Sequence, residues 1–402
     1  MAETLKSKKQ QPSVWKNCRV EDFCTTASGG TPLTTRRDYY DDGHIPWLRS
    51  GEVSQGRVRH AEISITQAGL DNSSAKLFKK GTILVAMYGA TAGEVGILEF
   101  ESSTNQAVCG ITPGPSVDGE FLFQALLLNK PTLIKMAGGG AQPNISQEII
   151  RNFKIPLPPL AEQRKIAEIL RAWDEAIETA EAELKAKQER KRWLATEVFS
   201  TFSKGSKALK LSDIVDRLTK AADNPEKYEV LSISSGRGFE LQREKYSRVI
   251  AGKQIAKYVL LSRGDFSYNK GNSLRYPVGC VYQLNEFSEG LVPNVFCSFR
   301  VIGDKCDAGY IRHYFSLGMH NEEVMKRVNM GVRNNGLLNI TPDQFFGITI
   351  KIPPLGAQRK IAEFLDLHDE EEVALTKRIG SLRTQKRGLM QKLLTGEVRV
   401  AA

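Results

Sequence analysis

Two stretches of the chain carry apolar residues at alternating spacings of four and three, the pattern of a coiled-coil seam. The first follows Pro158-Pro159 and the second follows Pro353-Pro354, and both are rich in helix-forming Glu, Ala, Lys, Arg, Gln and Leu. We therefore predict two long helices that end near Gly205 and Gly396. The seam residues expected to pair the helices are Ile166, Leu170, Trp173, Ile177 and Leu184 in the first and Ile361, Leu365, Leu375, Ile379 and Leu382 in the second.

The two stretches begin with copies of one segment. Residues 155–170 (IPLPPLAEQRKIAEIL) and 350–365 (IKIPPLGAQRKIAEFL) are identical at eleven of sixteen positions, at an offset of 195. The same offset relates Asn-Ile-Ser at 144–146 to Asn-Ile-Thr at 339–341. Since twice this offset nearly equals the length of 402 residues, the chain consists of two units, each a globular part followed by the repeated segment.

A helix of about forty residues spans about 60 Å and needs a partner to bury its apolar stripe. The nearest partner is its own repeat. Because the second helix is reached only after a further globular part, we expect it to run back along the first, forming an antiparallel coiled coil with an internal pseudo-two-fold axis. The alternative is two unrelated amphipathic helices, each packed on its own domain, which leaves the shared sequence and register unexplained.

The parts that precede the helices have an α+β pattern. The apolar runs 81–88 and 259–261 predict strands, and 121–128 and 310–318 predict helices. Apart from a glycine ahead of the apolar runs near 83 and 266 and a Gly-rich loop before each Asn-Ile-Ser/Thr, the two parts have little sequence in common. The expected domains are residues 1–154 and 205–349, called head one and head two below, and the helical segments 155–204 and 350–402.

The charge of the chain favours nucleic acid as a partner. There are 56 Lys and Arg against 46 Asp and Glu, and seven of the ten surplus positive charges lie outside the helical segments. No apolar run approaches the ~18 residues of a membrane helix, and the polar N-terminus does not resemble a signal peptide, so we expect a cytoplasmic protein. The six cysteines are widely spaced without a CxxC pair, which predicts reduced, buried thiols and no zinc site.

Two unlike heads on a rigid spacer predict a reader of an asymmetric, two-part DNA site with a gap of fixed length. Arg can read guanine and Asn or Gln can read adenine through paired hydrogen bonds, while Gly permits close approach of the backbone. For each candidate the alternative is an ordinary solvated loop residue. The candidate DNA-binding residues are Arg36, Arg37, Tyr88, Thr91 and Gln142 in head one and Asn269, Lys270, Asn272, Ser273, Arg275, Arg333, Asn334 and Asn335 in head two.

The repeated motif Ile-x-x-Pro-Pro-Leu-x-x-Gln-Arg-Lys-Ile-Ala-Glu, with the Asn-Ile-Ser or Asn-Ile-Thr before it, resembles the central and C-terminal conserved regions of type I restriction-modification specificity subunits. The resemblance covers essentially the whole chain. It implies two target-recognition domains, each for one half of a split site, and paired helices that dock two adenine-methylating subunits, which in turn recruit two restriction subunits. Two positions depart from the pattern: Ala357, where the first copy has Glu162, and the polar Glu372 in the seam.

The sequence lacks the usual motifs of an enzyme. It has no GxxxxGK[ST] loop, no GxGxxG after a strand and no HExxH, and its five histidines show no metal-ligand spacing, so we expect them to be surface groups or satisfied core groups. Residues 224–227 (NPEK) lack the second proline and the aromatic residue of an amino-methyltransferase motif. We expect a non-catalytic subunit without metal or cofactor, with S-adenosylmethionine on the methylating partner. The alternatives are a single-chain DNA methyltransferase or nuclease, and a coiled-coil scaffold that does not contact DNA.

Overall fold

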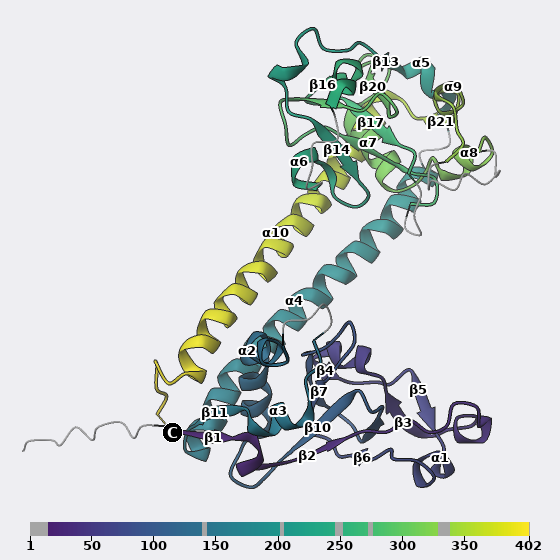
Figure 1. Cartoon of the computed structure of the whole chain (residues 1–402). Helices are drawn as coiled ribbons and strands as arrows, with labels where there is room; N and C mark the ends of the chain where they lie inside the picture. Colours follow the sequence, from purple (N-terminus) through teal and green to yellow (C-terminus); the bar gives the residue numbers. More distant parts are fainter. Residues whose placement is uncertain are drawn as a thin grey trace, which may run out of the picture. The chain divides into compact units, whose positions relative to one another are not determined.

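The computed structural model describes residues 15–138, 143–201, 205–245, 252–271, 276–328 and 338–401. The chain forms two compact units, of which only the second is continuous in sequence. Unit one consists of Met1–Glu181 with Lys377–Ala402, and unit two is Ala182–Thr376. The two longest helices, α4 (Leu160–Thr201) and α10 (Leu355–Leu394), each contribute residues to both units. Each unit therefore contains one head together with part of each helix (Figure 1).

The two long helices confirm the prediction from the seam pattern. They contain 42 and 40 residues, and each begins directly after the Pro-Pro pair of its repeat. Gly396 has a φ of +77°, a left-handed conformation that suits glycine and ends α10 just past Leu394. Gly205 follows the end of α4 with a φ of +88°. Both helices thus end close to the glycines that were predicted to terminate them.

In both units the helices pair in the antiparallel sense. In unit one, Asp174 and Glu181 of α4 form ion pairs with Lys386 and Arg383 of α10. In unit two, Lys187 pairs with Glu371 at 2.9 Å, and Lys191 pairs with Asp369. Residue numbers rise along one helix while those of its partners fall along the other.

The ten proposed seam residues lie on the covered sides of these helices. Seven are buried, and Trp173, Leu184 and Leu382 are half-buried. The polar Glu372 lies 3.6 Å from the Lys191 ammonium and so has an ionic partner in the seam. Ion pairing therefore explains why a charge is tolerated at this position.

Glu162, the residue that the second repeat replaces with Ala357, has a specific role in unit one. It accepts two hydrogen bonds of 2.7 Å from Arg399 and one of 3.3 Å from the indole of Trp15. The hydrogen bond from Arg399 lowers the pKa of the Glu162 carboxyl, although burial opposes this shift. Glu162 thus holds together two segments of unit one: the one before the first strand, which contains Trp15, and the one after α10, which contains Arg399.

Head one is built on two small sheets. The first has the strand order β2-β10-β7-β8-β4, and α2 packs against it (Figure 1). The second has the order β5-β3-β9-β6, and a separate antiparallel pair joins β1 to β11 just before α4. The strands are β1 (Lys16–Arg19), β2 (Cys24–Ser28), β3 (Ile45–Leu48), β4 (Arg57–Val58), β5 (Ile63–Ile65), β6 (Leu77–Phe78), β7 (Ile83–Ala86), β8 (Val95–Leu98), β9 (Ser102–Thr104), β10 (Val108–Pro113) and β11 (Lys154–Leu157). The helices are η1 (Val20–Asp22), η2 (Arg37–Tyr39), η3 (Ser50–Gln55), α1 (Gln67–Asp71), α2 (Gly119–Met136) and α3 (Gln147–Asn152).

Head two repeats the central part of this arrangement. Its four-stranded sheet has the order β13-β20-β17-β18, and β12 pairs with β21 just before α10. The strands are β12 (Lys207–Lys210), β13 (Val215–Leu218), β14 (Leu231–Ser234), β15 (Gly238–Leu241), β16 (Val259–Ser262), β17 (Phe266–Asn269), β18 (Cys280–Gln283), β19 (Glu289–Val292), β20 (Cys297–Val301) and β21 (Thr349–Ile352). The helices are α5 (Leu211–Ile214), α6 (Gln242–Lys245), α7 (Ala308–Ser316), α8 (Asn321–Met325), α9 (Pro342–Phe346), η4 (Pro225–Lys227) and η5 (Gly252–Lys257).

The repeated Gln of the Pro-Pro-Leu-x-x-Gln motif joins each long helix to its head. The Gln163 side chain accepts a hydrogen bond of 2.8 Å from the backbone N–H of Asp118, the N-cap of α2, and donates to Pro158 and Ser116 carbonyls. Gln358 makes the matching bonds to Asp307, the N-cap of α7, and to Pro353, each at 2.8 Å. Both amides are buried, so each bonds to backbone groups that water cannot reach.

We predict that Gln163→Ala lowers the free energy of unfolding by about 2–3 kcal/mol, because it leaves a buried N–H and two carbonyls without their partner. Urea denaturation of the purified chain measures the loss. The matched control is Arg164→Ala, at an exposed neighbouring position, which should change the free energy by about 0.5 kcal/mol or less. Equal effects of the two substitutions would contradict this role for Gln163.

Candidate nucleic-acid interface

The candidate contacts of head one lie in two places. Tyr88 and Thr91 belong to the loop between β7 and β8, where the Tyr88 side chain is 38% exposed and the Thr91 hydroxyl donates to the Ser50 carbonyl at 3.2 Å. Arg36 and Arg37 lie at η2, which contacts α1. The structure therefore brings the candidates together in pairs. Gln142 lies outside the described residues.

The loop that carries Tyr88 also brings in a residue that our list of candidates omitted. Tyr88 and Gly89 line a surface depression together with Pro143 and Asn144. Asn144 is exposed there, while the next residue, Ile145, is fully buried and anchors the segment. The repeated Asn-Ile-Ser/Thr motif contained this information, because it places an exposed amide directly before a core residue.

The arginines of η2 differ in how freely they can reach a ligand. Arg36 binds both carboxylate oxygens of Asp38, at 2.8 and 2.7 Å, and its guanidinium lies 4.8 Å from the centre of the Tyr39 ring. The neighbouring Arg37 is also exposed. Contact between Arg36 and a phosphate would have to compete with Asp38, whereas Arg37 carries no such carboxylate contact in the described structure.

In head two, the described candidates are Asn269 and Lys270 at the end of β17. The Asn269 amide donates to the Ile233 carbonyl at 3.1 Å and accepts from the Gly271 N–H at 3.0 Å. These bonds brace the start of the loop and leave one N–H and one lone pair of the amide for a base. Lys270 is half-buried. The other candidates lie outside the described residues: Asn272, Ser273, Arg275, Arg333, Asn334 and Asn335.

The cysteines do not form a reactive site. All six are free, five are buried and Cys18 is half-buried. Burial raises the pKa of Cys24, Cys109 and Cys306 to about 12, so these side chains remain neutral thiols near pH 7. Buried neutral thiols are neither ready nucleophiles nor ready metal ligands.

Two histidines of head two are buried, and His313 agrees with the expectation of a satisfied core group. His313, on α7, lies 2.6 Å from Asp366 and 3.8 Å from Asp369 of α10, and these three could hold a metal ion by distance alone. The two carboxylates, however, are already paired with Arg312 and Lys191. We therefore describe the cluster as an ion-pair network. Its members come from separate helices, so their sequence spacing could not reveal it.

His320 contradicts the prediction of a satisfied core histidine. Its side chain is buried against Phe315, and neither ring nitrogen has a hydrogen-bond partner among the residues that the structure describes. Burial lowers the pKa of His320 to about 3. The ring lines a cavity of about 520 Å³ together with Gly279 and Gly318, and the cavity exists where the short helix α7 has already ended at Ser316.

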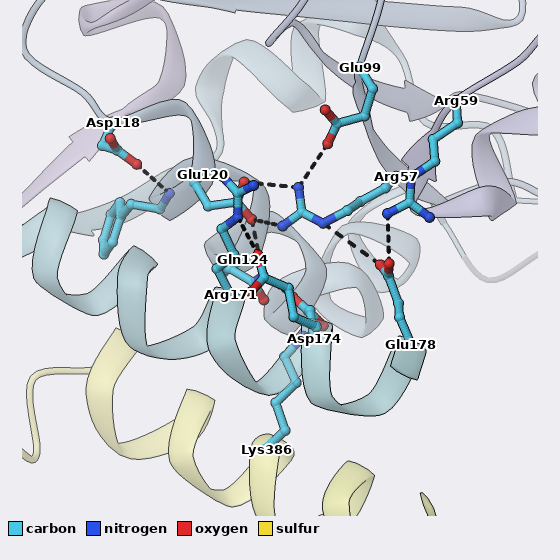
Figure 2. Close-up of polar contacts among 12 residues, drawn as sticks. Arg57, Arg59, Glu99, Asp118, Glu120, Gln124, Arg171, Asp174, Glu178 and Lys386 are labelled. Carbon is cyan, nitrogen blue, oxygen red and sulfur yellow. Dashed lines mark hydrogen bonds and ion pairs between the residues drawn. The ribbon is translucent and has the colours of Figure 1, made fainter. Parts of the chain in front are cut away.

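A dense network of charges connects head one to the long helices (Figure 2). Its centre is Arg57 of β4, whose side chain is only 8% exposed. The Arg57 guanidinium binds Glu99 after β8 at 3.1 Å and Glu120 of α2 at 3.1 Å, and it lies 3.9 Å from Glu178 of α4. No pattern in the sequence singles out Arg57, because a lone arginine on a short edge strand carries no motif.

The described part of the chain contains no helix long and apolar enough to cross a membrane. Its architecture is that of two unlike α+β heads on a shared pair of helices, with polar and basic loop residues on each head.

The chain belongs to the type I restriction modification DNA specificity domain family, whose model matches residues 12–188 and 217–381. It is 25% identical over 421 aligned residues to the MjaIX specificity subunit of a type I restriction enzyme from Methanocaldococcus jannaschii, covering 97% of this chain and 94% of the relative. The MjaVIII specificity subunit of the same organism is 23% identical, with the same coverage. The crystal structure of a type I S subunit from M. genitalium has a similar fold, with a TM-score of 0.57 at 16% identity over 96% of this chain and 98% of that one.

We predict that His320→Phe makes the protein less sensitive to acid. The unfolded chain protonates this histidine below about pH 6.5, whereas the folded protein resists protonation down to about pH 3, so folding stability falls as the pH drops through this window. Between pH 7 and 4.5 the wild type should therefore lose about 2–3 kcal/mol more than the variant. Urea denaturation across this range measures the difference, with the exposed His60→Phe as control. Parallel pH curves for wild type and His320→Phe would contradict the prediction.

Proposed function

We propose that this chain is the DNA-specificity subunit of a type I restriction-modification system and that it recognises an asymmetric, bipartite site for partner subunits that carry out the chemistry. The observation that carries the proposal is the duplicated architecture. The family model matches each half of the chain. In each half, a buried glutamine at the same position of the repeat, Gln163 or Gln358, joins the long helix to its head.

The asymmetry of the site follows from the difference between the heads. They share the central sheet order and the capped helix that receives Gln163 or Gln358, but the loops after β7 and β17 carry different side chains. Tyr88 and Thr91 occupy the loop of head one, while Asn269 and Lys270 begin the loop of head two. Because base edges are distinguished by the donors and acceptors presented to them, unlike loops select unlike half-sites.

The fixed gap follows from the helices. Helices of 42 and 40 residues span about 60 Å each, and their pairing through buried positions in both units resists bending and sliding. A hydrogen bond to a buried glutamine near the start of each helix, and not a flexible linker, holds each head to its helix. The helices therefore act as a spacer of constant length between the two half-sites.

The chemistry belongs to partner subunits. The relatives are specificity subunits of restriction enzymes, and this sequence lacks the Asn-Pro-Pro-aromatic motif of an adenine methyltransferase. We propose that two methylating subunits, which bind S-adenosylmethionine, dock on the paired helices, and that two restriction subunits complete the complex. Double-stranded DNA is the ligand of the heads.

Co-expression with a methylating subunit tests the proposal. Mapping of methylated adenines should show one split, asymmetric motif with a constant gap, present only when this chain is expressed. The purified chain alone, incubated with labelled S-adenosylmethionine and DNA, should transfer no methyl groups. Methylation that does not depend on this chain would overturn the proposal, and transfer by the chain alone would support the single-chain methyltransferase.

The length of the helices should set the gap. We predict that inserting one heptad into both α4 and α10, after Glu181 and after Thr376, lengthens the preferred gap by about three base pairs, because seven residues add about 10 Å and a base pair occupies about 3.4 Å. A heptad preserves the seam register. The control is an insertion into α4 alone, which should disrupt the pairing. Methylation mapping reads out the gap, and an unchanged gap in the double insertion would refute the spacer role.

A further inference from the structure

Head one is attached to the long helices by two kinds of contact. The first is apolar: Ile166 and Leu170 of α4 and Leu393 of α10 are buried in one core with Phe121 and Leu122 of α2. Apolar burial holds surfaces together strongly, but it is non-directional. By itself, this contact would oppose separation of the head from the helices. It would oppose a small rotation of the head on the helices, called rocking below, less strongly.

The second attachment is the charge network around Arg57 (Figure 2). Beyond the contacts of Arg57, the exposed Arg59 binds Glu178 at 2.6 Å, and Gln124 of α2 donates to Asp174 of α4 at 2.7 Å. Asp174 in turn pairs with Lys386 of α10. The network thus runs from an edge strand of the head through α2 to both long helices, and its hydrogen bonds are directional.

Part of the charge network lies well beyond the apolar contact along α4. Glu178 follows Leu170 by eight residues on α4, which corresponds to about 12 Å along the helix. A rocking of the head by about 10° around the apolar contact would displace the network by about 2 Å, enough to break hydrogen bonds of about 3 Å. The charges therefore oppose the motion that the apolar core permits.

The charged groups of the network are paired with one another where they are partly buried. The carboxylates of Glu99, Glu120, Asp174 and Glu178 face the cations of Arg57, Arg59, Lys386 and Lys80. Removal of one member would leave a partly buried charge without its partner, which costs much more than the intact pair contributes. A positioning role explains a cluster of this kind better than a stabilising role, because paired buried charges contribute little net stability.

Head two uses different chemistry at the matching position. Asp369 and Lys191 correspond to Asp174 and Lys386 at the repeat offset, and they also form an ion pair. His313 approaches Asp369 from α7, as Gln124 approaches Asp174 from α2. The arginine-centred network of four carboxylates is specific to head one among the described residues of the two heads.

We infer that the Arg57 network is a positioning device that fixes the orientation of head one on the helices and thereby determines how strictly the protein discriminates the length of the gap between its half-sites. The inference rests on the proposed function. A gap longer or shorter by one base pair moves a half-site by about 3.4 Å and rotates it by about 35° around the DNA axis. A head that rocks on its helices can follow such a change, whereas a braced head cannot.

The test uses the complex of this chain with its methylating subunit. Initial rates of methyl transfer are measured on the split site with the native gap and with gaps one base pair shorter and longer. For Arg57→Lys, which keeps the charge but loses the forked contacts, the ratio of native to altered-gap rates should fall about fivefold, the scale of losing one well-placed ion pair. The rate on the native gap should fall less, and the recognised bases should not change.

Two further variants make the result decisive. Glu178→Gln removes a partner of Arg57 at a position 40% exposed, so it tolerates substitution and should relax the gap in the same direction. As a matched control, Arg171→Met removes an exposed ion pair with Glu175 within α4 that does not involve the head, and it should keep the native ratio. Complexes of Arg57→Lys and Glu178→Gln with the native ratio would overturn the inference; if Arg57→Lys does not assemble, Glu178→Gln decides. A wild-type complex without a split site or a preferred gap would instead refute the proposed function.

Discussion

The whole protein depends on the mutual burial of two helices that cannot bury their apolar stripes alone. An isolated helix of 42 residues would expose Ile166, Leu170 and Ile177 to water, whereas in the folded chain all three are buried, Ile166 and Leu170 in one core with α2 and with a second long helix. The second repeat supplies that helix. Because both helices contribute to both compact units, each unit contains two helical segments that lie far apart in sequence. Folding of either head is therefore coupled to the pairing.

Charges in the seam give this pairing its register. Asp174 with Lys386 and Asp369 with Lys191 are the same pair, used twice at the repeat offset. Both lysines are largely covered by protein, so a shift of one helix along the other would separate them from their carboxylates in a place poor in water. A buried ion pair adds little net stability, but its loss is costly, which makes it a suitable marker of register.

The heads combine a constant attachment with variable loops. The attachment is the hydrogen bond from a capped head helix to Gln163 or Gln358, together with the apolar core around the first turns of each long helix. The loops after β7 and β17 lie on the central sheets and can differ in sequence without disturbing that attachment, since loop side chains contribute little to the core. This separation lets the two heads present different loops on the same kind of attachment.

The sequence by itself determined the helices, their antiparallel pairing, the duplication and the class of protein. The helices follow from local signals: a seven-residue apolar period, proline pairs that start the helices and glycines that end them. The duplication follows from the repeated segment, the antiparallel pairing from chain order, and the class of protein from the resemblance of the repeated motif. The bounds Leu160–Thr201 and Leu355–Leu394 agree with that prediction. The α+β character of the heads was also predictable, although the strand order was not.

Only the tertiary structure decided which side chains act together. Arg57, Glu120, Asp174 and Lys386 lie far apart in sequence, and His313 meets Asp366 across two helices, so no spacing pattern records these contacts. The same holds for Asn144 beside Tyr88 and for the buried, unpartnered ring of His320. Local periodicity reports what each segment buries, whereas directional bonds between segments depend on where the fold places them.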